Sequence, residues 1–340
     1  MRAAVLHRIG EKLDVTDWPK PEPGPGELLI KVAACGVCHS DLHAIEGDWT
    51  PLPNLPLIPG HEVAGHVEAA GPGVAGFAPG DVVGVPWMFS ACGTCEFCLA
   101  GMETICKLGE ATGYTRPGGY ADYLVAPAAF VARLPTDTDL HATAPILCAG
   151  VTTYRGLKRT GARPGQWVAI LGIGGLGHIA VQYAKAMGLR VLAVDVAEDK
   201  LALARELGAE LTVLAGPEAA QTVQGAVGGV HAAVVTAVAR QAFEQAIDML
   251  RPAGTVCYIG LPGGDADKIR ASISAITNWE LSIRGSNVGT RLDLAEAVSF
   301  ATRGLVRAHT RKVPLTAVND VLAEMKAGKI VGRVVLDLTH

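Results

Sequence analysis

A glycine-rich turn between an apolar strand and a periodic helix constrains the fold most. The apolar segment 167–171 runs directly into four closely spaced glycines: Gly172, Gly174, Gly175 and Gly177. Apolar residues then recur at helical spacing over 176–187. Such glycines permit a tight turn and a close approach of the backbone to a pyrophosphate, which lies at the helix N-terminus. The pattern predicts a dinucleotide-binding βα unit, although a plain glycine loop in such a unit is the simpler alternative.

A second apolar strand supports the dinucleotide interpretation. The segment 191–196 contains Asp195, close to the ~20 residues expected between the glycines and an acidic residue. A carboxylate there can accept hydrogen bonds from an adenosine ribose, and its charge would repel a 2′-phosphate. We therefore expect NAD rather than NADP.

The region 151–287 alternates strand and helix patterns. Candidate strands are 167–171, 191–196, 232–238, 255–260 and 281–285, and candidate helices are 176–187, 198–207 and 240–250. This rhythm predicts a doubly wound parallel sheet. Residues 1–150 are instead rich in short strands and Gly/Pro turns, and helical stretches are expected near 292–302 and 317–327.

Composition limits the class of protein. Apolar residues make up 49% of the 340 and charged residues 18%, which excludes a largely disordered chain. The net charge of −4 does not favour binding to nucleic acid or to an anionic membrane. Glycines interrupt the apolar runs well before the ~18 residues that a membrane span needs. We expect a soluble, cytoplasmic chain of two domains whose thiols stay reduced.

Eight cysteines in such a chain suggest a metal. Four of them crowd into CGTCEFCLAGMETIC: Cys92, Cys95, Cys98 and Cys106. Four thiolates close a tetrahedral zinc site with no open position, which makes the site structural. An iron–sulfur cluster is the rival metal, but the last gap is too long for the ferredoxin spacing and no proline follows Cys106. Four unrelated thiols in one loop are the simplest alternative.

Further candidate ligands are spread along the chain. Cys38 opens the segment CHSDLH, His61 lies in GHE, and Cys148 comes much later. A catalytic zinc needs about three protein ligands and one open position. A lone histidine or cysteine is more often a packed or solvated side chain than a ligand, so spacing alone does not select these residues.

The motifs together resemble the zinc-containing alcohol dehydrogenases of the medium-chain dehydrogenase/reductase superfamily. They are GVCHSDLHAIEGDW, GHE with the following glycines, the four-cysteine loop, the glycine-rich turn and the closing IVGRVVLDL, and they span essentially the whole chain. The resemblance implies an α/β protein in two domains. A GroES-like β-barrel catalytic domain would comprise 1–150 together with 288–340 and carry both zinc sites. A Rossmann NAD-binding domain would comprise 151–287.

The resemblance also implies roles for particular residues. Cys38, His61 and Cys148 would bind the catalytic zinc, Asp41 would orient the histidine ligand, and Glu62 would lie near the ion. In related polyol dehydrogenases a glutamate beside the histidine is the third ligand, but the presence of Cys148 favours the alcohol dehydrogenase arrangement.

By the same resemblance, Ser40 and His43 would carry the proton away from the alcohol. His39 and Arg333 would meet the cofactor pyrophosphate, and Lys200 would join Asp195 at the ribose. Helix capping and a solvated histidine are the alternatives for Ser40 and His43. Trp49 and Trp87 would line the substrate pocket, although both could be ordinary core aromatics.

The expected protein is an NAD-dependent alcohol dehydrogenase with one catalytic and one structural Zn²⁺ per subunit, similar to the bacterial and yeast-type tetramers that prefer small alcohols. It would interconvert primary, and some secondary, alcohols with aldehydes or ketones. A polyol, aromatic-alcohol or thiol-adduct dehydrogenase of the same superfamily is the nearest alternative. A non-catalytic binding protein stabilised by zinc is the alternative of another class.

Overall fold

The structure is a computed structural model that describes residues 1–262 and 267–339. Internal contacts divide the chain into two compact units. The first comprises Met1–Cys148, Gly289–Thr302 and the chain from Arg307 on. The second comprises Ala149–Val288 and Arg303–Val306. The expected domain borders lie close to these, except that 303–306 groups with the second unit.

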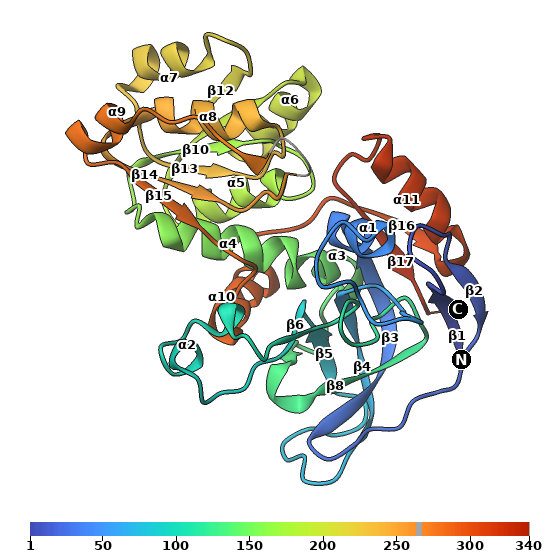
Figure 1. The fold of residues 1–340 in the computed structure, drawn as a ribbon. Coiled ribbons are helices and arrows are strands. Elements are labelled where there is room, and N and C mark those ends of the chain that lie inside the picture. The colour runs from blue at the N-terminus through green and yellow to red at the C-terminus, as the bar shows by residue number, and fades with distance from the viewer. Residues whose placement is uncertain (263–266, 340) are drawn as a thin grey trace. The chain divides into compact units, whose positions relative to one another are not determined.

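The first unit is built on a mainly antiparallel sheet (Figure 1). Its strands follow the order β16 (Thr310–Pro314), β17 (Arg333–Asp337), β3 (Glu27–Val37), β4 (Glu62–Ala70), β5 (Val82–Val85) and β9 (Ala132–Arg133), with β8 (Tyr123–Pro127) also paired to β3. Among the described strands of this sheet, only β16 and β17 pair in parallel. Two register shifts between β3 and β4 mark bulges, which bend a sheet. A separate antiparallel pair joins β1 (Arg2–Val5) to β2 (Asp14–Asp17).

Short helices complete this unit. They are α1 (His39–Glu46), η2 (Ala128–Phe130), α3 (Leu140–Thr143), η3 (Ala144–Leu147), α10 (Arg291–Thr302), η5 (Leu315–Ala317) and α11 (Val318–Lys326). In α11, Val318, Val321, Leu322 and Met325 recur at helical spacing and join the core over the sheet. The helices expected near 292–302 and 317–327 are thus present as α10 and α11.

The four-cysteine segment forms a lobe with little core of its own. The antiparallel strands β6 (Met88–Ser90) and β7 (Glu110–Ala111) enclose it. Between them lie α2 (Glu96–Leu99) and η1 (Glu103–Ile105), neither of which has a buried residue. Burial of apolar surface therefore contributes little to this lobe, and another interaction must stabilise it.

The second unit contains a six-stranded parallel sheet (Figure 1). Its strands follow the order β12 (Leu211–Leu214), β11 (Arg190–Asp195), β10 (Trp167–Leu171), β13 (Val230–Val235), β14 (Leu250–Tyr258) and β15 (Ser282–Gly285). Numbered along the chain, this is the 3-2-1-4-5-6 order of dinucleotide-binding folds. The prediction of a doubly wound parallel sheet is confirmed.

Helices cover both faces of this sheet. They are α4 (Ala149–Thr160), α5 (Gly177–Ala186), α6 (Glu198–Leu207), α7 (Ala219–Val227), α8 (Arg240–Asp248) and α9 (Ile273–Asn278). Figure 1 shows α4 and α5 against one face and α7 and α8 against the other. The sequence analysis placed α5, α6 and α8 within two residues at each end but missed β12, α4, α7 and α9.

Candidate functional site

A buried cluster of metal-binding side chains lies in the first unit. Ligand atoms of four residues lie within 4.8 Å of one another: Cys38, His61, Glu62 and Cys148. Nε2 of His61 is 3.2 Å from Sγ of Cys148. Cys38 lies between β3 and α1, His61 precedes β4, and Cys148 follows η3. The fold therefore brings together the three expected ligands of a catalytic zinc from distant parts of the chain.

Asp41 holds this cluster through four hydrogen bonds. Oδ1 accepts from Nδ1 of His61 at 2.8 Å and from the backbone N–H of Gly60 at 3.1 Å. Oδ2 accepts from the backbone N–H of Cys38 at 2.9 Å and from the hydroxyl of Tyr120 at 2.8 Å. Each partner is a donor, so the carboxylate is satisfied as an anion although Asp41 is only 1% exposed. One side chain thus ties two ligand-bearing segments together.

The hydrogen bonds of the cluster define which of its atoms can bind a metal. Burial lowers the pKa of His61, but the Asp41 carboxylate outweighs it and holds that pKa well above its usual value, so a metal has to displace the Nε2 proton in order to bind. Because Nδ1 donates to Asp41, Nε2 of the neutral ring carries the lone pair that a metal binds. Despite burial, the Cys148 thiol and His61 hold the pKa of Cys38 well below its usual value. The thiolate of Cys38, which is the form that binds zinc, is therefore favoured. The hydrogen bond with Cys38, together with burial, holds the pKa of Cys148 well above its usual value, so binding of a metal would release the proton of that thiol.

A buried ion pair lies beside the cluster. The guanidinium of Arg333, on β17, donates to Oε1 of Glu62. A Cβ on Gly36 would lie 1.9 Å from Oε2 of Glu62, so glycine leaves the space that this carboxylate occupies. Burial raises the pKa of Glu62 to about 7, and Arg333 opposes that shift. Among the described residues Oε2 has no hydrogen-bond partner, which fits a carboxylate placed beside a cation.

The four-cysteine lobe has the geometry of a closed tetrahedral site. Its four sulfurs lie within 4.8 Å of one another, and Sγ of Cys92 is 3.9 Å from that of Cys98. The sulfurs of Cys95 and Cys106 are also 3.9 Å apart. A tetrahedron with Zn–S bonds of about 2.3 Å has edges of about 3.8 Å, so the spacing fits zinc. Backbone N–H groups of Thr94 and Cys95 lower the pKa of Cys92 to about 6, which favours a thiolate.

A series of aromatic side chains in contact with one another begins next to His61. The ring of Trp87 meets that of His61 edge-on with centroids 4.9 Å apart, and Trp49 meets Trp87 at 6.0 Å. The ring centroid of His43 lies 5.0 Å from that of Trp49. Tyr114 contacts both tryptophans, at 5.8 and 5.9 Å. Close to the cluster itself, the hydroxyl of Ser40 is 3.9 Å from Sγ of Cys38.

The glycine-rich turn in the second unit forms an open cradle. Gly172 has φ +93°, a conformation that favours glycine. A Cβ on Gly177 would lie 1.8 Å from the carbonyl oxygen of Gly172, so only glycine lets α5 begin this close to β10. Gly174 instead faces open space, and its neighbour Gly175 is half-buried. This arrangement leaves room for a phosphate against the backbone.

Asp195 ends β11 beside that turn. Its carboxylate accepts from the backbone N–H of Ile173 at 2.6 Å and of Ala197 at 3.1 Å. Nζ of Lys200 lies 4.0 Å from Oδ1 of Asp195. The structure therefore brings the expected ribose-binding pair together at the carboxyl end of the sheet.

Two expected cofactor residues lie elsewhere in the first unit. His39 is exposed, with its ring centroid 6.5 Å from that of His43. Arg333 is buried against Glu62. Their contact with a pyrophosphate stays a prediction.

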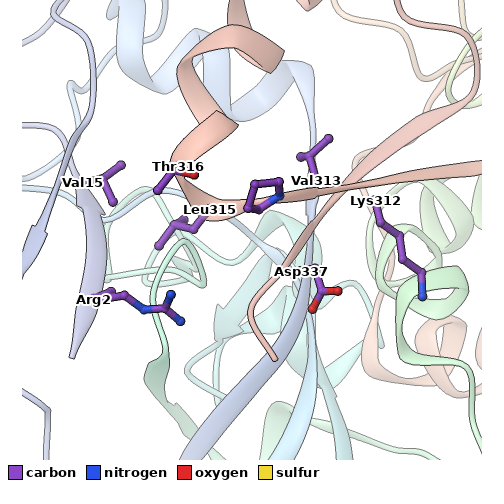
Figure 2. A pocket seen from close by; sticks show the side chains of 8 residues that line it. Arg2, Val15, Lys312, Val313, Leu315, Thr316 and Asp337 are labelled. Carbon is purple, nitrogen blue, oxygen red and sulfur yellow. The ribbon is translucent and has the colours of Figure 1, made fainter. Parts of the chain in front are cut away.

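A separate hollow of the first unit contains none of the expected site residues. Figure 2 shows the side chains that line it: Arg2, Val15, Lys312, Val313, Pro314, Leu315, Thr316 and Asp337. Arg2 already pairs with Asp122, and Asp337 accepts from Thr339. We assign this hollow no role in the chemistry.

Sequence reasoning missed Tyr114, which contacts both tryptophans, and two further residues that the structure places in the site. Tyr120 supports Asp41 from a loop 79 residues further along the chain, and no local pattern marks that contact. Asp48 bonds to Nδ1 of His43 at 2.7 Å. The glycine before it, which ends α1, is the signal that could have located this second residue.

Comparisons with known proteins agree with this geometry. Residues 24–136 match the family model of the alcohol dehydrogenase GroES-like domain, and residues 175–303 match that of the zinc-binding dehydrogenases. An alcohol dehydrogenase from Moraxella sp. (strain TAE123) is 50% identical over 340 residues, which cover 100% of both chains.

Solved structures are similar over nearly the whole chain. The alcohol dehydrogenase of the archaeon Aeropyrum pernix has a TM-score of 0.90 at 35% identity, covering 99% of this chain and 100% of that one. An NAD-dependent alcohol dehydrogenase has a TM-score of 0.92 at 32% identity, covering 99% of both. In the parts of the chain that the structure describes, no helix has the length and hydropathy to cross a bilayer. The chain belongs to the zinc-type alcohol dehydrogenases of the medium-chain dehydrogenase/reductase superfamily.

Proposed function

We propose that this chain is an NAD-dependent dehydrogenase that interconverts small alcohols with aldehydes or ketones. The buried set of Cys38, His61 and Cys148, oriented by Asp41, is the observation that carries the proposal. The first unit would be the catalytic domain and the second the NAD-binding domain. One solved relative is NAD-dependent, and the cradle at Gly172–Gly177 with Asp195 fits that cofactor here.

Two metal sites with different functions follow from their ligand sets. Cys38, His61 and Cys148 would hold a catalytic Zn²⁺, with Glu62 close by. Such an ion supplies Lewis acidity to an oxygen at its open position. Cys92, Cys95, Cys98 and Cys106 would hold a structural Zn²⁺ in a closed set. Purified, loaded protein should therefore contain two zinc ions per chain, and one ion only would contradict the proposal.

The surrounding residues would move the proton and select the substrate. The Ser40 hydroxyl, next to Cys38, would accept the proton of the alcohol, and His43 would pass it to solvent. Trp49 and Trp87 would restrict the pocket to small or slender alcohols, because two indoles fill much of the space beside His61. In the second unit, Asp195 and Lys200 would bind the adenosine ribose of NAD.

The test is the rate of NADH formation across a series of primary and secondary alcohols, with and without a zinc chelator. We expect turnover with short primary alcohols and its loss after chelation. A loaded protein that reduces NAD with none of these alcohols would overturn the proposal. Preferred turnover of polyols, aromatic alcohols or thiol adducts would move the chain to another branch of the superfamily.

We also propose a cytoplasmic homotetramer. The edge strand β15 and the residues before it expose large apolar side chains, with Trp279 46% and Ile283 40% exposed. Such an edge is suited to association with a second copy. Sedimentation of the purified protein tests this assembly, and a monomer at working concentration would contradict it.

A further inference from the structure

The turn that ends α1 brings Asp48 back to His43. Gly47 has φ +74°, and the backbone N–H groups of Gly47 and Asp48 both donate to the carbonyl oxygen of His43, at 3.0 and 3.1 Å. A Cβ on Gly47 would also lie 2.6 Å from a side-chain carbon of Ile9. Only glycine suits this helix end, which places the side chain after it beside the histidine.

The resulting contact constrains the imidazole in two ways. Oδ2 of Asp48 is 2.7 Å from Nδ1 of His43. An ionised carboxylate only accepts, so Nδ1 carries a proton and Nε2 is the acceptor of the neutral ring. The ring of Trp49 packs on the histidine at 5.0 Å and 35°, which limits its rotation.

The other charged groups around this turn have different contacts. Glu46, at the same helix end, bonds to Lys326 of α11. The charge of Asp48 also raises the pKa of Lys326. The hydrogen bond of the Asp48 carboxylate, however, is to the imidazole of His43. His39 is a further titratable residue nearby, and its ring centroid is 6.5 Å from that of His43.

We propose that Asp48 is a positioning residue that fixes the Nδ1–H tautomer and the orientation of His43, so that Nε2 accepts the proton released by the reaction. This inference rests on the relay role proposed above for His43. Asp48 itself touches neither substrate nor cofactor in this proposal.

The first test observes the tautomer and does not depend on activity. Long-range ¹H–¹⁵N NMR spectra of the histidine-labelled holoenzyme, assigned with H43Q, report which ring nitrogen carries the proton above pH 8. We expect Nδ1–H in the wild type and a shift toward Nε2–H, the form favoured in free histidine, in Asp48→Ala. An Nε2–H tautomer in the wild type would overturn the inference even if alcohol oxidation proceeds as proposed.

The second test is a double-mutant cycle on alcohol oxidation. Removing a partner that orients a functional imidazole typically costs about 10–100-fold, and the half-exposed site allows water to substitute, so we expect about a tenfold lower kcat in Asp48→Ala. Asp48→Asn should recover part of the loss, because its amide oxygen can still accept from Nδ1. In the His43→Gln background Asp48→Ala should have no further effect.

Glu46→Gln is the matched control, since it removes a carboxylate at the same helix end that bonds to Lys326 instead. It should leave both kcat and the tautomer unchanged. Equal losses from Asp48→Ala with and without His43 would show that Asp48 acts by another route and would overturn the inference. A wild-type rate in His43→Gln would refute the relay itself, whereas a wild-type rate in Asp48→Ala alone would refute only the positioning role.

Discussion

Tyr120→Phe tests whether the hydrogen bonds around Asp41 retain the catalytic metal. The substitution removes one hydroxyl and keeps the ring, which packs so closely on Gly60 that a Cβ there would lie 2.4 Å from a ring carbon. Burial raises the pKa of Tyr120 well above its usual value, so the wild-type hydroxyl is protonated and donates. The variant therefore removes one of two donors to Oδ2 of Asp41 and creates no large cavity.

The structure sets the size of the effect. A hydrogen bond to a charged group contributes about 1.5–3 kcal/mol, and no water can replace a hydroxyl at a tyrosine that is 0% exposed. Loss of groups that support a zinc-bound histidine typically weakens metal binding about 10–100-fold. We expect a change within that range at the catalytic site and none at the four-cysteine lobe.

The assay is competition for zinc against a chelator of known affinity, with the two ions per chain resolved by their release rates. Tyr258→Phe is the control, because its hydroxyl donates at 2.9 Å to the neutral carbonyl of Phe243 in the second unit. In the Asp41→Asn background, Tyr120→Phe should lose most of its effect on zinc affinity, because the charged acceptor is already gone. Wild-type zinc affinity in the single variant Tyr120→Phe would refute the reasoning, since the fourth hydrogen bond would then contribute nothing to the metal site.

Four further substitutions separate the remaining roles. Cys148→Ala should abolish NADH formation while circular dichroism stays native, and near-wild-type activity would remove Cys148 from the ligand set. Cys98→Ala should lower the unfolding temperature and release one zinc, because the lobe has little core of its own; a stable but inactive protein would instead place the lobe in the active site. Asp195→Gly should raise the ratio of NADP to NAD use, and an unchanged ratio would show that Asp195 does not contact the ribose. Gly177→Ala should destabilise the second unit by about 1–3 kcal/mol in denaturant and weaken NAD binding, because its Cβ would lie 1.8 Å from the Gly172 carbonyl; wild-type values would contradict the close helix–strand approach.

Periodicity predicted the centre of the second unit well because the strands β10, β11 and β13 are buried on both faces. All five residues of Trp167–Leu171 are buried, and the following glycines mark the turn without ambiguity. Leu211–Leu214 was missed because it is short and half-buried, with Leu214 exposed. Edge strands are defined more by their neighbours than by their own composition.

The metal ligands could be predicted only in part from the residues themselves. The four-cysteine spacing is local and chemically specific, whereas Cys38, His61 and Cys148 meet only after the first unit has folded. The resemblance to a family was therefore needed to select them. It did not extend to Tyr120, which meets Asp41 only in the folded chain, and it gave no role to Asp48, although Asp48 lies within the quoted motif GVCHSDLHAIEGDW.

Asp195, at the end of β11, limits how the preference for NAD over NADP can change. Asp195 is bonded to two backbone N–H groups, one of which belongs to the glycine turn itself. Replacing Asp195 by a small neutral residue would remove the charge that repels a 2′-phosphate. The same replacement would also remove the hydrogen bonds that Asp195 accepts from the glycine turn and from Ala197, and so destabilise the turn. Engineering, or natural drift, toward the phosphorylated dinucleotide should need a compensating change near Ile173 before the new specificity becomes useful.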